Sequence, residues 1–148
     1  MYTPGKIIFF DPFYFKNGAQ SKPKYFLVLA KVGTTAVLAS LPSSKDYVPR
    51  TIAVEHGCIE VPEGCVNCYV FKAGIKITDC GFSFPMDTFL YGQYLDDFEI
   101  SLLESNYPLV GIDYDVVGEL TAEELAAVIK CFGMSATVKR KYKKILTG

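Results

Sequence analysis

Three short apolar runs near the start of the chain constrain its fold more than any other feature. They cover residues 7–10, 25–30 and 36–41, and each is as long as an ordinary β-strand. Gly33 lies in the gap at 31–35 between the second and third runs, and a glycine in a gap of that length predicts a hairpin turn. The first part of the chain is therefore predicted to be β-structure.

Further strands are predicted up to about residue 92. These runs are short and interrupted by glycine and proline, a pattern typical of strands that wrap a small barrel. They cover residues 51–54, 69–71, 75–77, 82–84 and 88–91. Residues 96–105 fit a short helix with Phe98, Leu102 and Leu103 facing inward, and they fit a strand nearly as well.

Helices are predicted at the C-terminal end. Thr121 is followed three residues later by Glu124, the spacing of a capping box, and Gly133 is a natural end for a helix that begins there. A second helix is predicted at about 135–146. The chain is thus expected to be mainly β with C-terminal helices (α+β), one domain over residues 1–148. Its barrel would cover about 4–115 and its helical part about 119–146.

Composition supports a folded chain. Hydrophobic residues make up 50% and aromatic residues 14% of the 148 residues, which argues against disorder. No apolar run approaches the roughly 20 residues of a membrane helix. Lys6 is followed by only four apolar residues before Asp11, too few for a secretory signal. We therefore expect no membrane segment and a cytoplasmic location.

Charge is strongly segregated along the sequence. Residues 1–76 carry nine basic and five acidic side chains, residues 77–129 carry eleven acids and no base, and residues 130–148 carry six bases and no acid. The net charge of −1 therefore hides this division, and a basic face can coexist with an acidic one. A solvated acidic surface balanced by a basic tail explains the pattern equally well.

The cysteines allow two interpretations. Five cannot all pair within one chain, and without an export signal we predict reduced thiols. Cys65 and Cys68 form a C-x-x-C, half of a zinc knuckle, which residues elsewhere would have to complete. We favour small packed side chains over zinc, and the chain has no nucleotide-binding motif, so we expect no metal and no cofactor. The residues that would complete a zinc site are His56, Cys58 and Cys80.

His56 is the only histidine in the chain. An imidazole titrates near neutral pH and can carry acid–base catalysis. Its neighbours, however, resemble a strand that runs into a turn, and a single histidine in such a place is more often structural. We interpret His56 as structural.

Basic and aromatic side chains gather around the first loop. Tyr14 and Phe15 are followed by Lys16, and loop aromatics beside lysines suit stacking on unpaired bases. The same residues, with Phe13, would suit a protein-binding patch or a dimer contact if they are exposed. Ser43 and Ser44 follow the third run, with Lys45 next to them, and strand ends are where a β-scaffold often displays its chemistry.

The order of these pieces resembles the MazF/PemK-like toxin superfamily, whose members are small SH3-like barrels and act as endoribonucleases. The resemblance lies in Pro4-Gly5 before a strand, a polar loop, the lysine–proline segment at 22–24, two strands and the serine pair. The segment 118–125, GELTAEEL, is similar to the start of the family's C-terminal helix. The region 46–115 matches poorly and is longer than the family core.

The resemblance implies a function and its residues. The protein would be a metal-independent endoribonuclease acting on single-stranded RNA, the toxin of a toxin–antitoxin pair, with an antitoxin protein as partner and a homodimeric assembly. The family's arginine beside the second strand corresponds to Lys22 or Lys24, and its hydroxyl after the third strand to Ser43 or Ser44.

Lysine in place of arginine is a departure from the family, because an ammonium group lacks the planar fork of guanidinium. Arg50 is the one arginine of the predicted barrel and the obvious substitute. The remaining RNA contacts would come from Tyr14, Phe15, Lys16 and Lys45. The alternative is a non-catalytic barrel that binds RNA or a partner protein through its aromatic and basic loop.

Overall fold

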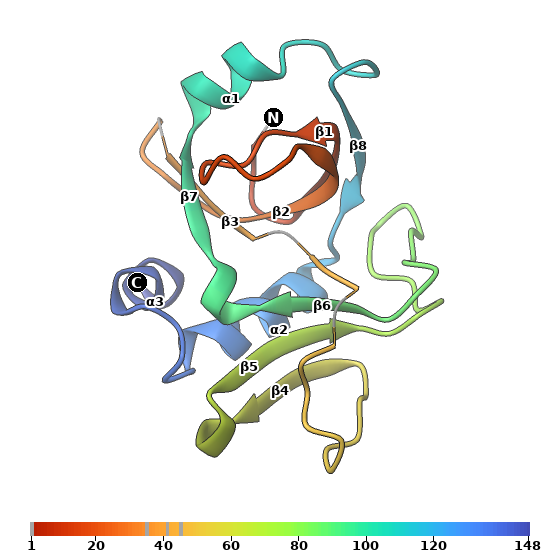
Figure 1. Ribbon diagram of the computed structural model, residues 1–148, viewed down its shortest axis with the longest axis vertical. Coiled ribbons are helices and arrows are strands. Elements are labelled where there is room, and N and C mark those ends of the chain that lie inside the picture. Colours follow the sequence, from red (N-terminus) through yellow and green to blue (C-terminus); the bar gives the residue numbers. More distant parts are fainter. Residues whose placement is uncertain (1, 35, 41, 45) are drawn as a thin grey trace.

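Two antiparallel sheets form the framework of the protein in a computed structural model that describes residues 2–34, 36–40, 42–44 and 46–148. The larger sheet has the order β7 (Asp96–Glu99), β3 (Ala36–Ser40), β2 (Lys22–Val32), β1 (Lys6–Phe13) and β8 (Tyr114–Glu119). The smaller sheet has the order β4 (Gly57–Val61), β5 (Val66–Phe71) and β6 (Thr88–Tyr91). The chain passes from one sheet to the other where β6 runs into β7 through a short 3₁₀ turn, Gly92–Tyr94 (Figure 1).

The central strands of the larger sheet are covered on both faces, and this explains why β1 and β2 contain continuous apolar runs. Successive side chains of a strand point to opposite faces. In β1, Ile7 joins one buried cluster with Leu27 of β2, while Ile8 joins the other with Phe26. If one face of the sheet were exposed to water, polar and apolar residues would alternate along each strand.

Each face of the larger sheet has its own helical cover. Val128 and Phe132 of α2 (Ala122–Gly133) and Tyr142 of α3 (Arg140–Thr147) belong to the cluster that contains Ile7. On the other face, Ile100 and Leu103 of α1 (Ile100–Asn106) belong to the cluster that contains Ile8. Figure 1 shows α1 beyond β1 at one end of the molecule and α2 with α3 beside the smaller sheet. The predicted α+β class is confirmed.

The start of α2 confirms the N-cap predicted at Thr121. The backbone N–H of Glu124 donates to Thr121 Oγ1 over 3.2 Å. The other half of the capping box is not made, because the Thr121 N–H donates to the carbonyl oxygen of Ile77 instead. The Glu124 carboxylate is therefore available for contacts elsewhere.

Several of the predicted strands are absent, and two strands were not predicted. Residues 51–54, 75–77 and 82–84 are not strands, and the strands β4 and β8 form where none was predicted. Residues 96–106 form both alternatives in sequence, β7 and then α1. Leu103 is buried as expected, while Leu102 is 59% exposed.

The second C-terminal helix begins at Arg140, five residues later than about 135. Ser135 is held outside a helix because its hydroxyl donates to Glu60 Oε1 over 2.9 Å, and the Thr137 N–H donates to the same hydroxyl. The sequence also predicts that Val138, Tyr142 and Ile145 of this segment are buried; Val138 and Tyr142 are buried, while Ile145 is partly buried.

The prediction that all five cysteines are reduced was wrong for two of them. A disulfide joins Cys58 of β4 to Cys131 of α2 across 73 residues of sequence. The pairing of β4 with β5 and the packing of α2 bring these residues together. Such a contact between distant segments cannot be predicted from a local sequence pattern. Cys65, Cys68 and Cys80 are free thiols, and burial raises the pKa of Cys68 to about 12.

The two sheets are further connected by isolated bridges. Ser43, just after β3, pairs with Phe89 of β6, and Thr78 pairs with Leu120. Among the described residues the pairing yields two sheets and not one closed barrel. None of the helices in the same ranges is long and apolar enough to cross a bilayer.

Candidate functional site

The predicted lysines and serines meet at the junction of the two sheets. Lys22 and Lys24 are two residues apart on β2, so their side chains leave the same face of the strand. Ser43 is fixed by a pair of backbone hydrogen bonds with Phe89, from its N–H over 2.8 Å and to its carbonyl oxygen over 2.7 Å. These contacts hold the end of β3 beside β6.

Two adjoining hollows share Lys22, Lys24 and Ser43 in their linings, and we call them together the lysine–serine cleft. The smaller hollow, of about 350 Å³, also includes Ser44. The larger hollow, of about 740 Å³, also includes Phe15. All four residues predicted to be catalytic therefore lie along one concave surface.

Aromatic side chains accompany the charges of the cleft. Phe15, Tyr47 and Tyr94 line the larger hollow, and the Lys22 ammonium lies 5.9 Å from the centre of the Phe15 ring. Tyr47 and Tyr94 are about half exposed, at 49% and 48%. The cleft thus offers positive charge, hydroxyl groups and flat apolar surfaces to a ligand.

The described lining of the cleft contains no carboxylate, no histidine and no arginine. With two lysines and no acid among these residues, the cleft favours an anionic ligand. It offers groups that bind and stabilise negative charge but no conventional proton acceptor.

Lys16 and Arg50, which were also predicted to contact RNA, do not line this cleft. Lys16 pairs with Asp96 over 3.2 Å, and its ammonium lies 4.2 Å from the Phe98 ring centre. Arg50 is exposed on the loop before β4 and does not line the cleft, so it does not substitute for a missing arginine there. Lys45 lies outside the described residues.

The expectation that Phe13, Tyr14 and Phe15 share one exposed patch was wrong for Phe13. Phe13 is only 2% exposed, because its ring stacks on Tyr107 with 5.7 Å between the centres. Tyr14 is 61% exposed, and Phe15 is partly buried. Tyr107 follows α1, so part of the region 46–115 covers the first loop.

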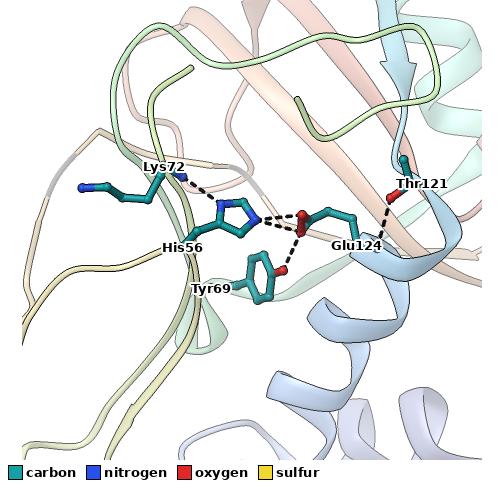
Figure 2. A network of polar contacts seen from close by, with 5 residues as sticks. All are labelled: His56, Tyr69, Lys72, Thr121 and Glu124. Atoms are coloured by element: carbon teal, nitrogen blue, oxygen red, sulfur yellow. Dashed lines mark hydrogen bonds and ion pairs between the residues drawn. The ribbon is translucent and has the colours of Figure 1, made fainter. Parts of the chain in front are cut away.

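A second polar cluster connects the smaller sheet to α2 (Figure 2). His56 Nε2 lies 2.7 Å from Glu124 Oε1, and the Tyr69 hydroxyl donates to Glu124 Oε2 over 2.5 Å. The backbone N–H of Lys72 donates to His56 Nδ1 over 3.2 Å. Since Nδ1 accepts, the neutral ring carries its proton on Nε2 and donates to Glu124.

This second cluster is structural in character. Burial, followed by the hydrogen bond to Glu124, raises the pKa of Tyr69 well above its usual value, so the phenol stays a donor. Both nitrogens of His56 are occupied, which agrees with the structural interpretation of this residue. These contacts were not foreseen from the sequence, because the partners are far apart in the chain. Glu124 lies 68 residues from His56 and 55 residues from Tyr69.

The C-x-x-C motif divides between two environments. Cys65 is exposed after a 3₁₀ turn, whereas Cys68 is buried in the smaller sheet with Ile59 and Val70. In the part of the chain that the structure describes, no three histidine, cysteine or acidic side chains gather as a metal ion would require. Cys58, which would complete a zinc set, is in the disulfide.

Fold and site together define an α+β protein of two antiparallel sheets with a lysine–serine cleft at their junction. Comparison of the chain with protein-family models, with curated proteins and with solved structures found no match.

Proposed function

We propose that the lysine–serine cleft binds single-stranded RNA and that the protein is a MazF/PemK-like, metal-independent endoribonuclease, the toxin of a toxin–antitoxin pair. The observation that carries this proposal is the gathering of Lys22, Lys24, Ser43 and Ser44 along one concave surface. An SH3-like arrangement of the strands is part of the proposal. The continuous path from β6 into β7, which joins the two sheets, supports it.

The binding part of the proposal follows from the chemistry of the cleft. Lysine ammonium groups track the phosphates of a single strand, while exposed aromatic rings stack on its bases without requiring a particular sequence. Lys22 and Lys24 supply the charges, and Tyr47 and Tyr94 supply the rings. A duplex would hide its bases from these rings, so the proposed ligand is single-stranded.

The cleavage part assigns each group a role. The 2′-hydroxyl of one nucleotide gives its proton to solvent water, the same solvent that later protonates the leaving 5′-oxygen, and its oxygen attacks the adjacent phosphorus. The bond to the 5′-oxygen then breaks, and that oxygen is protonated, giving a 2′,3′-cyclic phosphate and a 5′-hydroxyl. Lys24 stabilises the charge that develops on the phosphoryl oxygens, and Ser43 donates a hydrogen bond to one of them.

A second candidate function is binding without cleavage. It is favoured by the composition of the cleft, whose described lining lacks a histidine or carboxylate to accept the 2′-hydroxyl proton and an arginine to grip the phosphate. On this alternative the same lysines and aromatic rings hold the RNA, or a partner protein, and no bond breaks.

An end-labelled single-stranded RNA, incubated with the protein in the presence of a chelator, distinguishes the two functions. The matched variants are K22Q/K24Q in the cleft and K76Q at an exposed lysine outside it. Cleavage that survives the chelator and K76Q but is lost in K22Q/K24Q supports the enzyme. Binding without cleavage supports the second candidate, and cleavage that survives K22Q/K24Q contradicts the assignment of the site.

A further inference from the structure

A small aromatic pocket adjoins the lysine–serine cleft. It has a volume of about 160 Å³, and it shares Phe15, Asn17 and Tyr94 with the larger hollow of the cleft. Phe98 of β7 contributes a further aromatic wall. The aromatic pocket is therefore next to the hollow in which a bound strand is proposed to lie.

Ser40, the last residue of β3, also lines the aromatic pocket. It is 1% exposed, and its hydroxyl oxygen has no hydrogen-bond partner among the described residues. Buried hydroxyl groups are nearly always paired, because an unpaired one loses its bonds to water without replacement. A buried hydroxyl at a pocket therefore indicates a ligand that supplies the missing partner.

Other polar groups of the pocket narrow the chemistry of that ligand. Asn17 Oδ1 already accepts from the Ala19 N–H over 2.9 Å, which leaves the amide NH₂ to donate. Asp96, which pairs with Lys16, adds a carboxylate acceptor. Donors with an acceptor among them match a ring edge that presents carbonyl oxygens and an N–H, as uracil and guanine do.

We propose that the aromatic pocket is a base-selecting subsite that takes one keto-bearing nucleobase, uracil in preference, with Ser40 hydrogen-bonded to its edge. The pocket, at about 160 Å³, is smaller than either hollow of the cleft and suits a single small ring better than a bicyclic one. This proposal rests on the proposed function, because the base would come from an RNA strand bound in the cleft. A free nucleoside carries the same ring and could occupy the same pocket.

The first measurement uses free nucleosides and needs no cleavage. Uridine, guanosine, cytidine and adenosine are titrated separately into isotope-labelled protein, and the amide signals of Ser40, Phe15 and Tyr94 are followed by NMR. We expect these signals to shift with uridine at a concentration about tenfold lower than with adenosine or cytidine, the size of effect that one selective hydrogen bond gives.

The second measurement compares RNA oligomers that differ in one base. S40A should lower the preference for uracil about five- to tenfold and leave the affinity for a strand without uracil unchanged. S101A, at an exposed serine of α1, is the matched control and should keep the preference. Since the Ser40 hydroxyl lacks a partner, S40A should melt no lower than the wild type. If it does not fold, Y94A at the half-exposed wall replaces it, and only the base preference is then compared, because Tyr94 also lines the cleft and its loss should weaken binding of every strand.

The outcomes separate this proposal from the proposed function. Uridine shifts at the pocket without RNA binding would support a nucleoside site and overturn the RNA function. RNA binding with no base preference, or with a preference unchanged in both S40A and Y94A, would overturn the subsite and leave the RNA function standing.

Discussion

His56 Nε2 lies 2.7 Å from Glu124 Oε1, and this contact joins the segment before β4 to the first turn of α2. The Glu124 side chain is only 13% exposed and accepts from Tyr69 as well. Seven residues further along the same helix, Cys131 is bonded to Cys58 of β4. Two positions about two turns apart on one face of α2 thus hold the helix against the smaller sheet.

Removing the Glu124 carboxylate should destabilise the protein. In E124A the Tyr69 hydroxyl and His56 Nε2 lose their acceptor while remaining largely buried, so we expect the free energy of unfolding to fall by about 2–3 kcal/mol. The exposed neighbour Glu123 provides the control, because E123A should cost no more than about 0.5 kcal/mol. Urea unfolding of the three proteins measures both values, and equal losses in the two variants would contradict a bonding role for Glu124.

The disulfide predicts a definite pattern of thiol reactivity. Under non-reducing conditions the folded protein should titrate two accessible thiols, Cys65 and Cys80, because Cys68 is buried. Unfolding without reductant should raise the number to three, and reduction to five. Reduction should also lower the free energy of unfolding by about 2–4 kcal/mol, since the bond closes a long loop. Five thiols in the unreduced, unfolded protein would refute the disulfide.

Buried phenols should make the protein sensitive to alkali. Desolvation raises the pKa of Tyr91 to about 12, while an unfolded tyrosine titrates near 10.0. The contribution of Tyr91 to stability is therefore fully present below pH 10 and is lost as the pH rises towards 12, because only the unfolded chain releases the proton in that range. Unfolding experiments on the wild type and Y91F between pH 8 and pH 12 test this; a stability loss of the same size in both would exclude Tyr91 as the cause.

Salt should weaken RNA binding through the lysines of the cleft. Each phosphate contact on a single strand contributes about −0.7 to the slope of log affinity against log salt, so K22Q should make the slope shallower by about 0.7. K76Q, outside the cleft, should leave the slope unchanged. Fluorescence anisotropy over a range of salt concentrations gives both slopes. Identical slopes in wild type and K22Q would show that Lys22 does not contact a phosphate.

A homodimer remains our prediction for the assembly in solution. Tyr14 and Leu102 are 61% and 59% exposed and line one hollow of about 330 Å³, and apolar surface of this kind favours association. Light scattering across a concentration series should report twice the chain mass of 16.4 kDa, and Y14E should shift it towards one chain. A mass of 16.4 kDa at every concentration would rule out the dimer.

Local sequence patterns determined the parts of the fold that local forces govern. The runs that became β1, β2, β3 and β6 were visible because strand-length apolar segments lie between turn residues, and the bounds of β6 were predicted to the residue. The cap at Thr121 was visible because its hydroxyl acts only three residues away. Lys22, Lys24, Ser43 and Ser44 were singled out by the order of segments along the chain, and the β2–β3 hairpin brings them to one surface, while their catalytic role stays a prediction.

Only the tertiary structure decided the contacts between distant segments. β8 has a weak pattern of its own and is a strand because β1, more than 100 residues earlier, offers it a hydrogen-bonding edge. The same holds for Cys58 with Cys131 and for His56 with Glu124, which the packing of α2 on the smaller sheet brings together. Glu124 read as a capping residue in the sequence. Its carboxylate accepts from His56 and Tyr69 instead, because the Thr121 N–H is already bonded to the carbonyl oxygen of Ile77, whereas a largely buried histidine and phenol need an acceptor.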